Sequence, residues 1–374
     1  MSLSLGKGAP RARAIDAFTK VKTMPTLQRR RLVLAAGTAA ALGASLPASA
    51  ARAAAARPPP LRARRLRPGD TIALVNPSAA VYERAPYEIA TESLQALGFK
   101  VREAPHLRAR RGQFAGSDAE RAGDINAMFA DAQVQGLLAL TGGSGGARML
   151  PLVDYALLRR NPKFLGGFSD LTALINAVHA RTGLVTFHCP LGVSEWNEFS
   201  VRQLRGAVMD AEALLLANPP DRGDAIVPRG ERISTIRGGR ARGHLVGGNL
   251  TVFAGLAGSG YWPALDGAVL FLEDVNEYLY RIDRALATLR LAGALERLAG
   301  VALGAFTNCT PGDGGYGSLT LDEIFDDYFK PLGIPVYAGA SFGHIKRKFT
   351  LPVGLDVEID ADAGTLRYLQ PAVL

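Results

Sequence analysis

Short apolar runs alternate with amphipathic stretches along residues 70–190 of this chain. The apolar runs end at Gly, Pro, Asn or His, which is typical of short buried strands. The stretches between them carry apolar residues at helical spacing, and one begins with the capping box Ser117-Asp118-Ala119-Glu120. The pattern predicts strands at 71–75, 136–140, 163–166 and 184–187, separated by helices at 87–97, 117–130 and 171–178.

Strands that alternate with helices predict an α/β fold with a parallel sheet. Such a sheet places ligands beyond the carboxyl ends of its strands. The glycine-rich loop 141–146 follows the strand at 136–140, and the turn Gly166-Gly167-Phe168-Ser169-Asp170 follows the strand at 163–166. We therefore expect a ligand site that includes both the loop and the turn.

The pattern weakens over residues 195–240, where clusters of Gly, Pro and Asn predict a linker. The roughly 324 residues that follow position 50 exceed what one hydrophobic core usually supports. We expect a first domain at 68–194 and a smaller α/β domain at 241–374. The landmarks of the second are Gly247-Gly248-Asn249-Leu250, a strand at 268–272 that ends at Glu273-Asp274, a helix at 280–292, a strand at 300–306, and Gly343-His344.

Residues 1–50 have the composition of an export signal. Arg29-Arg30-Arg31 precede the apolar run 32–46, which is too short to span a bilayer comfortably, and the small residues 48–50 follow as a cleavage site. Paired arginines ahead of the apolar run favour the twin-arginine route. We expect a periplasmic protein with no stable membrane insertion.

The basic residues behind the formal net charge of +9 lie outside the globular part of the chain. Residues 1–50 hold eight Lys and Arg against one acid, and 51–67 hold six Arg and no acid, which leaves −4 for the remainder. The Ala, Pro and Arg composition of 51–67 predicts a disordered lead-in. Because the basic charge sits in the leader and lead-in, we expect no nucleic-acid partner.

Cys189 and Cys309 are the only cysteines, and each ends an apolar segment. A periplasmic setting permits one disulfide between them, whereas their positions favour two ordinary buried thiols. Their spacing matches no zinc motif.

Ser169 lies on a glycine-flanked turn between a predicted strand and a predicted helix. A sharp turn of this kind lifts a serine hydroxyl clear of its neighbours, as in the nucleophile elbow of hydrolases, although the second glycine of the G-x-S-x-G motif is absent here. A structural interpretation competes with catalysis, because Ser169 or Asp170 could cap the following helix.

A serine nucleophile needs a base, and the base needs an orienting acceptor. Two of the five histidines are candidates for the base: His188 ends a strand near Ser169 in sequence, and His344 follows Gly343 in a later loop. Glu273 comes directly after an almost wholly apolar strand and is the candidate acceptor. The residues alone do not choose between the two histidines.

A longer set of motifs, in order from about residue 70 to the end, resembles the LD-carboxypeptidase family of serine peptidases (peptidase family S66), which trim murein tetrapeptides. In the first half these are Gly142-Gly143-Ser144-Gly145, Leu150-Pro151, Asp154-Tyr155, Asn161-Pro162-Lys163, Gly166-Gly167-Phe168-Ser169-Asp170, Thr172-Ala173-Leu174 and Phe187-His188-Cys189-Pro190. In the second half they are Gly247-Gly248-Asn249-Leu250, Leu272-Glu273-Asp274, Tyr280-Arg281, Gly304-Ala305-Phe306 and Gly343-His344.

The resemblance implies a flavodoxin-like or class I amidotransferase-like first domain, and a triad of Ser169 as nucleophile, His344 as base and Glu273 as orienting acid. It implies that His188 has a structural or pocket-lining role. The oxyanion donors are then the backbone N–H groups of Gly143 and Asp170, and glycine suits a loop whose backbone approaches the developing charge.

The same resemblance implies murein peptides as partners, a homodimer, and no metal or cofactor. Ser144, His188 and Asn249 are further candidates for substrate binding. The terminal carboxylate of a peptide needs a cationic or N–H partner, for which Arg148 and Arg281 are candidates, although surface or inter-domain ion pairs also explain them.

The chain departs from the family pattern at three positions, each of which leaves the triad intact. Ser144 stands where an aromatic residue is common, Thr141 where an arginine precedes the paired glycines, and Cys189 where a glycine is common. Two other functions remain: a microcin-immunity peptidase of the same superfamily, against which export argues, and a non-catalytic periplasmic murein-peptide-binding protein, which needs no triad.

Overall fold

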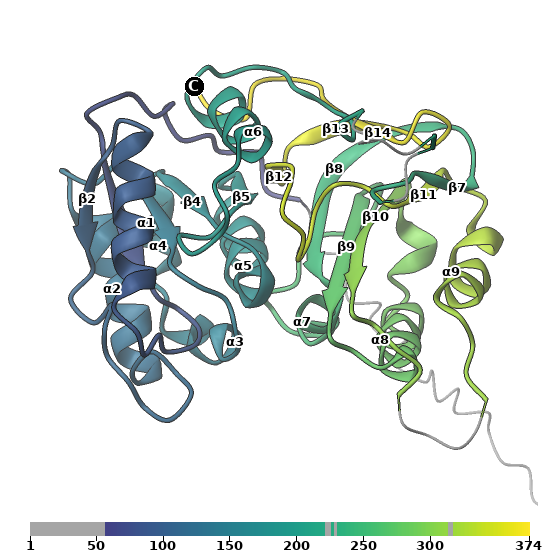
Figure 1. Ribbon diagram of the computed structural model, residues 1–374, viewed down its shortest axis with the longest axis horizontal. Helices are drawn as coiled ribbons and strands as arrows, with labels where there is room; N and C mark the ends of the chain where they lie inside the picture. The colour runs from purple at the N-terminus through teal and green to yellow at the C-terminus, as the bar shows by residue number, and fades with distance from the viewer. Residues whose placement is uncertain (1–56, 221–225, 228–229, 313–316) are drawn as a thin grey trace, which may run out of the picture. The chain divides into compact units, whose positions relative to one another are not determined.

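The computed structural model describes residues 57–374 apart from 221–225, 228–229 and 313–316 (Figure 1). The predicted export signal at 1–50 lies outside this range. Within the described residues, no helix is both long enough and apolar enough to cross a membrane.

The first sheet has five parallel strands in the flavodoxin-like order β2-β1-β3-β4-β5. Its strands are β1 (Thr71–Val75), β2 (Lys100–Glu103), β3 (Gly136–Ala139), β4 (Phe164–Gly166) and β5 (Thr186–His188). A sixth strand, β12 (Leu351–Val353), pairs antiparallel with β5. The expected parallel α/β domain is confirmed. The apolar pattern missed β2, a strand at the sheet edge whose residues are Lys, Val, Arg and Glu.

Helices follow the strands of this sheet as the alternation predicts. They are α1 (Ala85–Ala96), α2 (Asp118–Ala130), α3 (Gly146–Met149), α4 (Tyr155–Arg160), α5 (Thr172–Thr182) and α6 (Glu198–Val208), with 3-10 turns η1 (Leu150–Leu152) and η2 (Ser169–Leu171). The capping box of α2 is confirmed: Ser117 Oγ accepts from the Glu120 N–H at 3.2 Å, and Glu120 Oε2 accepts from the Ser117 N–H at 2.7 Å. Helix α5 is almost entirely buried, because it contacts β5 of the first sheet and β8 of the second (Figure 1).

The second sheet is mixed and has the order β6-β14-β13-β8-β9-β10-β11-β7. Four neighbouring strands are parallel: β8 (Arg240–Asn249), β9 (Val269–Val275), β10 (Gly300–Thr307) and β11 (Val336–Ala338). The antiparallel strands are β6 (Leu215–Leu216), β7 (Ser234–Arg237), β13 (Asp356–Asp360) and β14 (Thr365–Tyr368). Its helices are α7 (Leu250–Ala254), α8 (Leu279–Leu291) and α9 (Leu321–Phe329), with η3 (Leu295–Arg297) and η4 (Lys330–Leu332).

The two faces of β9 belong to different cores, because successive side chains of a strand point to opposite faces. Leu270 and Leu272 pack with the helices α7, α8 and α9. Val269 and Phe271 belong instead to the core that contains the first sheet. By the same alternation, the Glu273 side chain lies on the face of β9 that carries Val269 and Phe271, and it therefore faces the first sheet.

Two segments differ from the expected organisation. The expected linker 195–240 contains α6, β6 and β7, and α6 buries Phe199, Leu204 and Val208 at helical spacing.

Residues 57–67, expected within a disordered lead-in, pack on the folded chain. The Leu61 N–H donates to Gly183 O at 2.7 Å, and Ala63 and Leu66 are buried. Apolar residues spaced between the arginines explain this packing, since they reach the core while the charges stay at the surface.

Candidate active site

The Ser169 turn is strained. Ser169 has a φ of 65°, a left-handed conformation that residues other than glycine rarely adopt. Gly167 has a φ of 145°, and a Cβ atom at this position would lie 2.2 Å from Leu171 Cδ2. The turn joins β4 to η2 and α5, which is the setting in which hydrolases present a nucleophilic serine. Backbone strain of this kind tends to occur at functional sites.

Ser169, His344 and Glu273 form one hydrogen-bonded line. His344 Nε2 lies 3.1 Å from Ser169 Oγ, and His344 Nδ1 lies 2.7 Å from Glu273 Oε2. Gly343 has a φ of 108°, and a Cβ there would stand 3.0 Å from both Cβ and Oε2 of Glu273. Glycine before His344 therefore lets the imidazole approach the carboxylate closely. The structure brings together the three residues that the resemblance named.

The Glu273 carboxylate is completely buried and is ionised. Burial by itself raises its pKa, but its interactions with His188 and His344 outweigh burial and hold the pKa below the ordinary value. Burial lowers the pKa of His188, and the neighbouring Glu273 carboxylate opposes that shift. An ionised carboxylate beside His344 Nδ1 fixes the tautomer that leaves Nε2 free to accept a proton from Ser169.

The glycine-rich loop runs directly against Ser169. A Cβ on Gly142 would lie 2.8 Å from Ser169 Cβ and 2.9 Å from Ser169 Oγ, so a side chain there would displace the hydroxyl. Gly143 has a φ of 117° and is exposed. Within the described chain, the backbone N–H groups of Gly143 and Asp170 donate no hydrogen bond. Both N–H groups are thus available to a bound oxyanion.

The Asp170 side chain anchors two loops instead of capping the helix. Its Oδ2 accepts from Ser78 Oγ at 2.6 Å and from the Gly146 N–H at 2.7 Å. Neither Ser169 nor Asp170 makes a side-chain cap at η2 or α5, so the capping interpretation is wrong. The carboxylate reaches across to the glycine-rich loop because Gly146 lies against it without a side chain.

Arg121 also holds the glycine-rich loop by a hydrogen bond, and it was not among the candidate residues expected from the sequence. Its guanidinium is buried and donates to the carbonyl oxygens of Pro77 and Gly145 and to Asp118. Its place on the buried face of an amphipathic helix was a signal, because a buried arginine needs acceptors.

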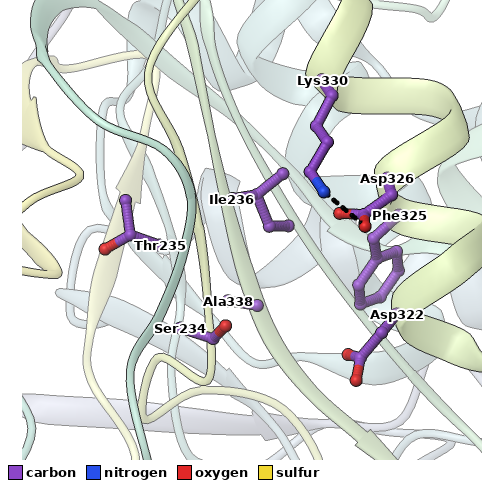
Figure 2. A pocket seen from close by; sticks show the side chains of 8 residues that line it. All are labelled: Ser234, Thr235, Ile236, Asp322, Phe325, Asp326, Lys330 and Ala338. Carbon is purple, nitrogen blue, oxygen red and sulfur yellow. Dashed lines mark hydrogen bonds and ion pairs between the residues drawn. The ribbon is translucent and has the colours of Figure 1, made fainter.

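A pocket begins at the residue after His344. It has a volume of about 590 Å³ and is lined by Glu195, Asn197, Glu231, Ile345, Lys346 and Arg347. A second pocket of about 250 Å³ lies between β7, β11 and α9, and its lining includes Ile236 and the ion pair of Lys330 with Asp326 at 2.6 Å (Figure 2). No triad residue lines this second pocket. No triad residue lines the first pocket either, which lies near the site only through Ile345, the residue that follows His344.

Comparison with known proteins agrees with the geometry. The family model of the LD-carboxypeptidase N-terminal domain matches residues 72–189, and that of the LD-carboxypeptidase C-terminal domain matches 242–359. This chain belongs to the LD-carboxypeptidase family. Ser169 and His188 lie in the part of the chain that matches the N-terminal family domain, and Glu273 and His344 lie in the part that matches the C-terminal one.

Individual relatives of this chain fall into two groups. The murein tetrapeptide carboxypeptidase of Pseudomonas aeruginosa is 31% identical over 76% of this chain and 91% of its own. The crystal structure of muramoyltetrapeptide carboxypeptidase from Oxalobacter formigenes is 28% identical, with a TM-score of 0.67 over 79% of this chain and 97% of that one. The microcin C7 self-immunity protein MccF of Escherichia coli is 27% identical over 81% of this chain and 94% of its own. The chain is therefore a hydrolase of the carboxypeptidase type.

The candidate substrate-binding residues Ser144 and Asn249 lie in different surroundings. Ser144 is exposed on the glycine-rich loop beside the triad. Asn249 is buried and uses both ends of its amide, since Nδ2 donates to Asp274 Oδ1 at 2.8 Å and Oδ1 accepts from the Val252 N–H at 3.1 Å. These contacts give Asn249 a structural role at the start of α7.

The two candidate arginines already have carboxylate partners. Arg148 makes a two-pronged pair with Asp118, its Nε and Nη2 lying 3.0–3.2 Å from the carboxylate oxygens. Arg281 lies 3.4 Å from Glu277 and its Nε donates to Tyr280 Oη at 3.1 Å. Arg148 and Arg281 therefore form surface ion pairs, which is the alternative to substrate binding that was expected from the sequence.

Lys348 lies near the triad and was not a candidate. It is 5% exposed, its Nζ stands 5.0 Å from the Phe168 ring centre, and burial lowers its pKa to about 8. Cys189 and Cys309 are both free; Cys189 is buried, and Cys309 is only half-buried.

Proposed function

We propose that this chain is a serine-type enzyme that removes the terminal D-alanine from murein tetrapeptides. The observation that carries the proposal is the hydrogen-bonded line Ser169–His344–Glu273, with separations of 3.1 and 2.7 Å. The murein substrate is supported by the name of the relative from P. aeruginosa. A binding protein needs no such line, which argues against the non-catalytic alternative.

The proposed reaction is acyl transfer. Ser169 Oγ attacks the carbonyl carbon of the bond to D-alanine, and its proton passes to His344 Nε2 while Glu273 holds the Nδ1–H. The Gly143 and Asp170 N–H groups stabilise the oxyanion, which in such sites is commonly worth about 3 kcal/mol per donor. His344 then protonates the departing amine, D-alanine leaves, and water activated by His344 hydrolyses the acyl-enzyme and restores Ser169.

The test is release of D-alanine from L-Ala-γ-D-Glu-meso-diaminopimelyl-D-Ala by the purified protein. We expect Ser169→Ala to reduce turnover roughly 10⁴-fold or more, because the other triad members do little without the nucleophile. Ser259→Ala, an exposed serine outside the site, is the matched control and retains wild-type turnover. Undiminished turnover by Ser169→Ala would refute the serine mechanism, and an inactive wild type would favour a binding protein.

A second candidate is cleavage of a peptidyl-nucleotide, as in microcin immunity. The 27% identity to MccF of E. coli supports it. The two functions separate in one competition assay, in which murein tetrapeptide and an aminoacyl sulfamoyl adenosine are offered together and the release of each product is followed. Preferential processing of the nucleotide would overturn the murein proposal.

We propose further that residues 1–50 direct the enzyme to the periplasm by the twin-arginine route. The charged region, short apolar run and small-residue cleavage site support this. Replacement of Arg30 and Arg31 by lysine is expected to retain the enzyme in the cytoplasm, measured by fractionation of D-alanine-releasing activity. Periplasmic activity of the double variant would contradict it.

We also propose a homodimer, on the basis of the family resemblance alone. Sedimentation equilibrium of the purified chain measures it directly, and a monomeric mass at micromolar concentration would count against the proposal.

A further inference from the structure

The second oxygen of Glu273 faces a histidine that the triad does not use. Glu273 Oε2 is engaged by His344, while Oε1 lies 4.0 Å from His188 Nε2. Glu273 has no exposed surface and His188 is 1% exposed. In the described part of the chain, Glu273 Oε1 and both ring nitrogens of His188 lack a hydrogen-bond partner.

An apolar residue would suit the surroundings of His188 better than an imidazole does. The ring packs against Phe168 at 5.5 Å, Phe271 at 5.3 Å and Phe342 at 6.2 Å between ring centres. Burial of two unpartnered ring nitrogens among phenylalanines costs free energy that a leucine or phenylalanine would avoid. Glu273 Oε1 is a polar atom within 4.0 Å of the ring, so the imidazole is best explained by that oxygen.

We propose that His188 is a positioning residue, whose Nε2–H donates to Glu273 Oε1 during the reaction and so extends the line to Ser169–His344–Glu273–His188. This inference rests on the proposed serine mechanism. The 4.0 Å separation is longer than a hydrogen bond, and closing it takes a movement of about 1 Å. Catalytic hydrogen bonds are often long in an empty site and shorten in the substrate complex.

The proposed bond has a defined effect on the pH dependence of the enzyme. A donor to Oε1 stabilises the carboxylate, so that the Glu273–His344 pair holds its proton less tightly. Without that donor the pair binds a proton more strongly, and the acidic limb of activity moves to higher pH. The titratable side chains that act on Glu273 are His188 from β5, His344 and Lys348 from the loop between β11 and β12, Asp274 from β9, and Cys309 from the segment after β10.

The experiment follows the reaction of Ser169 with an alkyl fluorophosphonate, which reports serine nucleophilicity without any murein substrate. The inactivation rate constant is measured against pH for the wild type, His188→Leu and His188→Gln. Glutamine keeps a donor near the position of Nε2 and leucine does not. His179→Gln, a change of a buried histidine elsewhere in the same domain, is the matched control.

We expect His188→Leu to raise the acidic half-point by about one pH unit, because a hydrogen bond to a charged group is worth roughly that shift. His188→Gln and His179→Gln keep the wild-type half-point. A packing role alone would lower the melting temperature of both His188 variants and leave the half-point in place. Equal half-points in the wild type and His188→Leu, or equal shifts in both His188 variants, overturn the proposal.

Two further outcomes separate this inference from the function on which it rests. Labelling of Ser169 without release of D-alanine refutes the murein substrate and leaves the His188 result valid. A wild-type enzyme that is not labelled at Ser169 refutes the serine mechanism, and the His188 proposal fails with it. His188→Phe, which preserves aromatic packing, replaces the leucine variant if that variant does not unfold cooperatively.

Discussion

At the scale of single residues, the backbone and the side chain of Asp170 contribute to the site in two different ways. Its backbone N–H is a proposed oxyanion donor, whereas its carboxylate holds Ser78 and Gly146. A side-chain substitution removes the second contribution and keeps the first. The glycine-rich loop then loses the contact that fixes it beside Ser169.

We expect Asp170→Ala to lower kcat for D-alanine release about tenfold or more, because a loop displaced by 1 Å misplaces the Gly143 N–H. It also leaves the Ser78 hydroxyl and the Gly146 N–H buried without an acceptor, at a cost of about 1–3 kcal/mol each. Asp170→Asn retains an acceptor oxygen, so we expect its kcat to lie between that of the wild type and that of Asp170→Ala. Steady-state kinetics with a melting curve checks this, and a wild-type kcat in the alanine variant would show that the loop holds its place unaided.

Residue chemistry was more predictable than residue contacts. Motif order singled out Ser169, His344 and Glu273, and the structure brings them together. Sequence could not tell that Asp170 holds a loop instead of a helix end, because either use needs only one carboxylate near one N–H group. The sequence also could not show that the Asn249 amide donates a hydrogen bond to Asp274, since that bond depends on how β8 and β9 align.

At the scale of elements, the segment 57–67 is part of the folded protein. We expect Leu66→Ala to reduce the free energy of unfolding by about 2–4 kcal/mol, because the side chain is 2% exposed and leaves a cavity. Arg65→Ala is the matched neighbour: its side chain is exposed, and its backbone N–H keeps its bond to Leu374 O. Urea unfolding measures both, and equal losses would mean that Leu66 does not pack as described.

The elements that the pattern predicted are those with unmixed signals. Buried parallel strands such as β1 and β3 read as continuous apolar runs, whereas β2 at the edge carries charges and was missed. The arginines of 57–67 concealed the buried Ala63 and Leu66 in the same way. Helix α6 has a clear apolar face, but the Pro and Gly that follow it dominated the interpretation of 195–240 as a linker.

At the scale of the whole molecule, buried histidines contribute to the response to acid. Burial lowers the pKa of His179 to about 4, and also lowers the pKa values of His188 and His244. A folded-state pKa below the unfolded value means that the unfolded chain binds more protons between those two values. The contribution of these histidines to stability is therefore full above pH 6.5 and decreases as pH falls toward 4.

For His179 alone this loss amounts to about 3 kcal/mol by pH 4. We expect the free energy of unfolding of His179→Gln to fall less steeply than that of the wild type between pH 6.5 and 4.5. Urea unfolding at several pH values gives both slopes. Parallel slopes would mean that His179 keeps its ordinary pKa in the folded protein.

The short strand β12 follows His344 closely in the chain and pairs with β5, which ends at His188. The segment that carries His344 leaves the second sheet and joins the first sheet as β12, which begins seven residues after His344. A hinge motion that opened and closed the two sheets around a ligand would have to break the pairing of β12 with β5 at every turnover. Ser169, His344 and Glu273 are consequently held together in the folded chain without a ligand, and a ligand would have to reach them with the β12–β5 pairing intact.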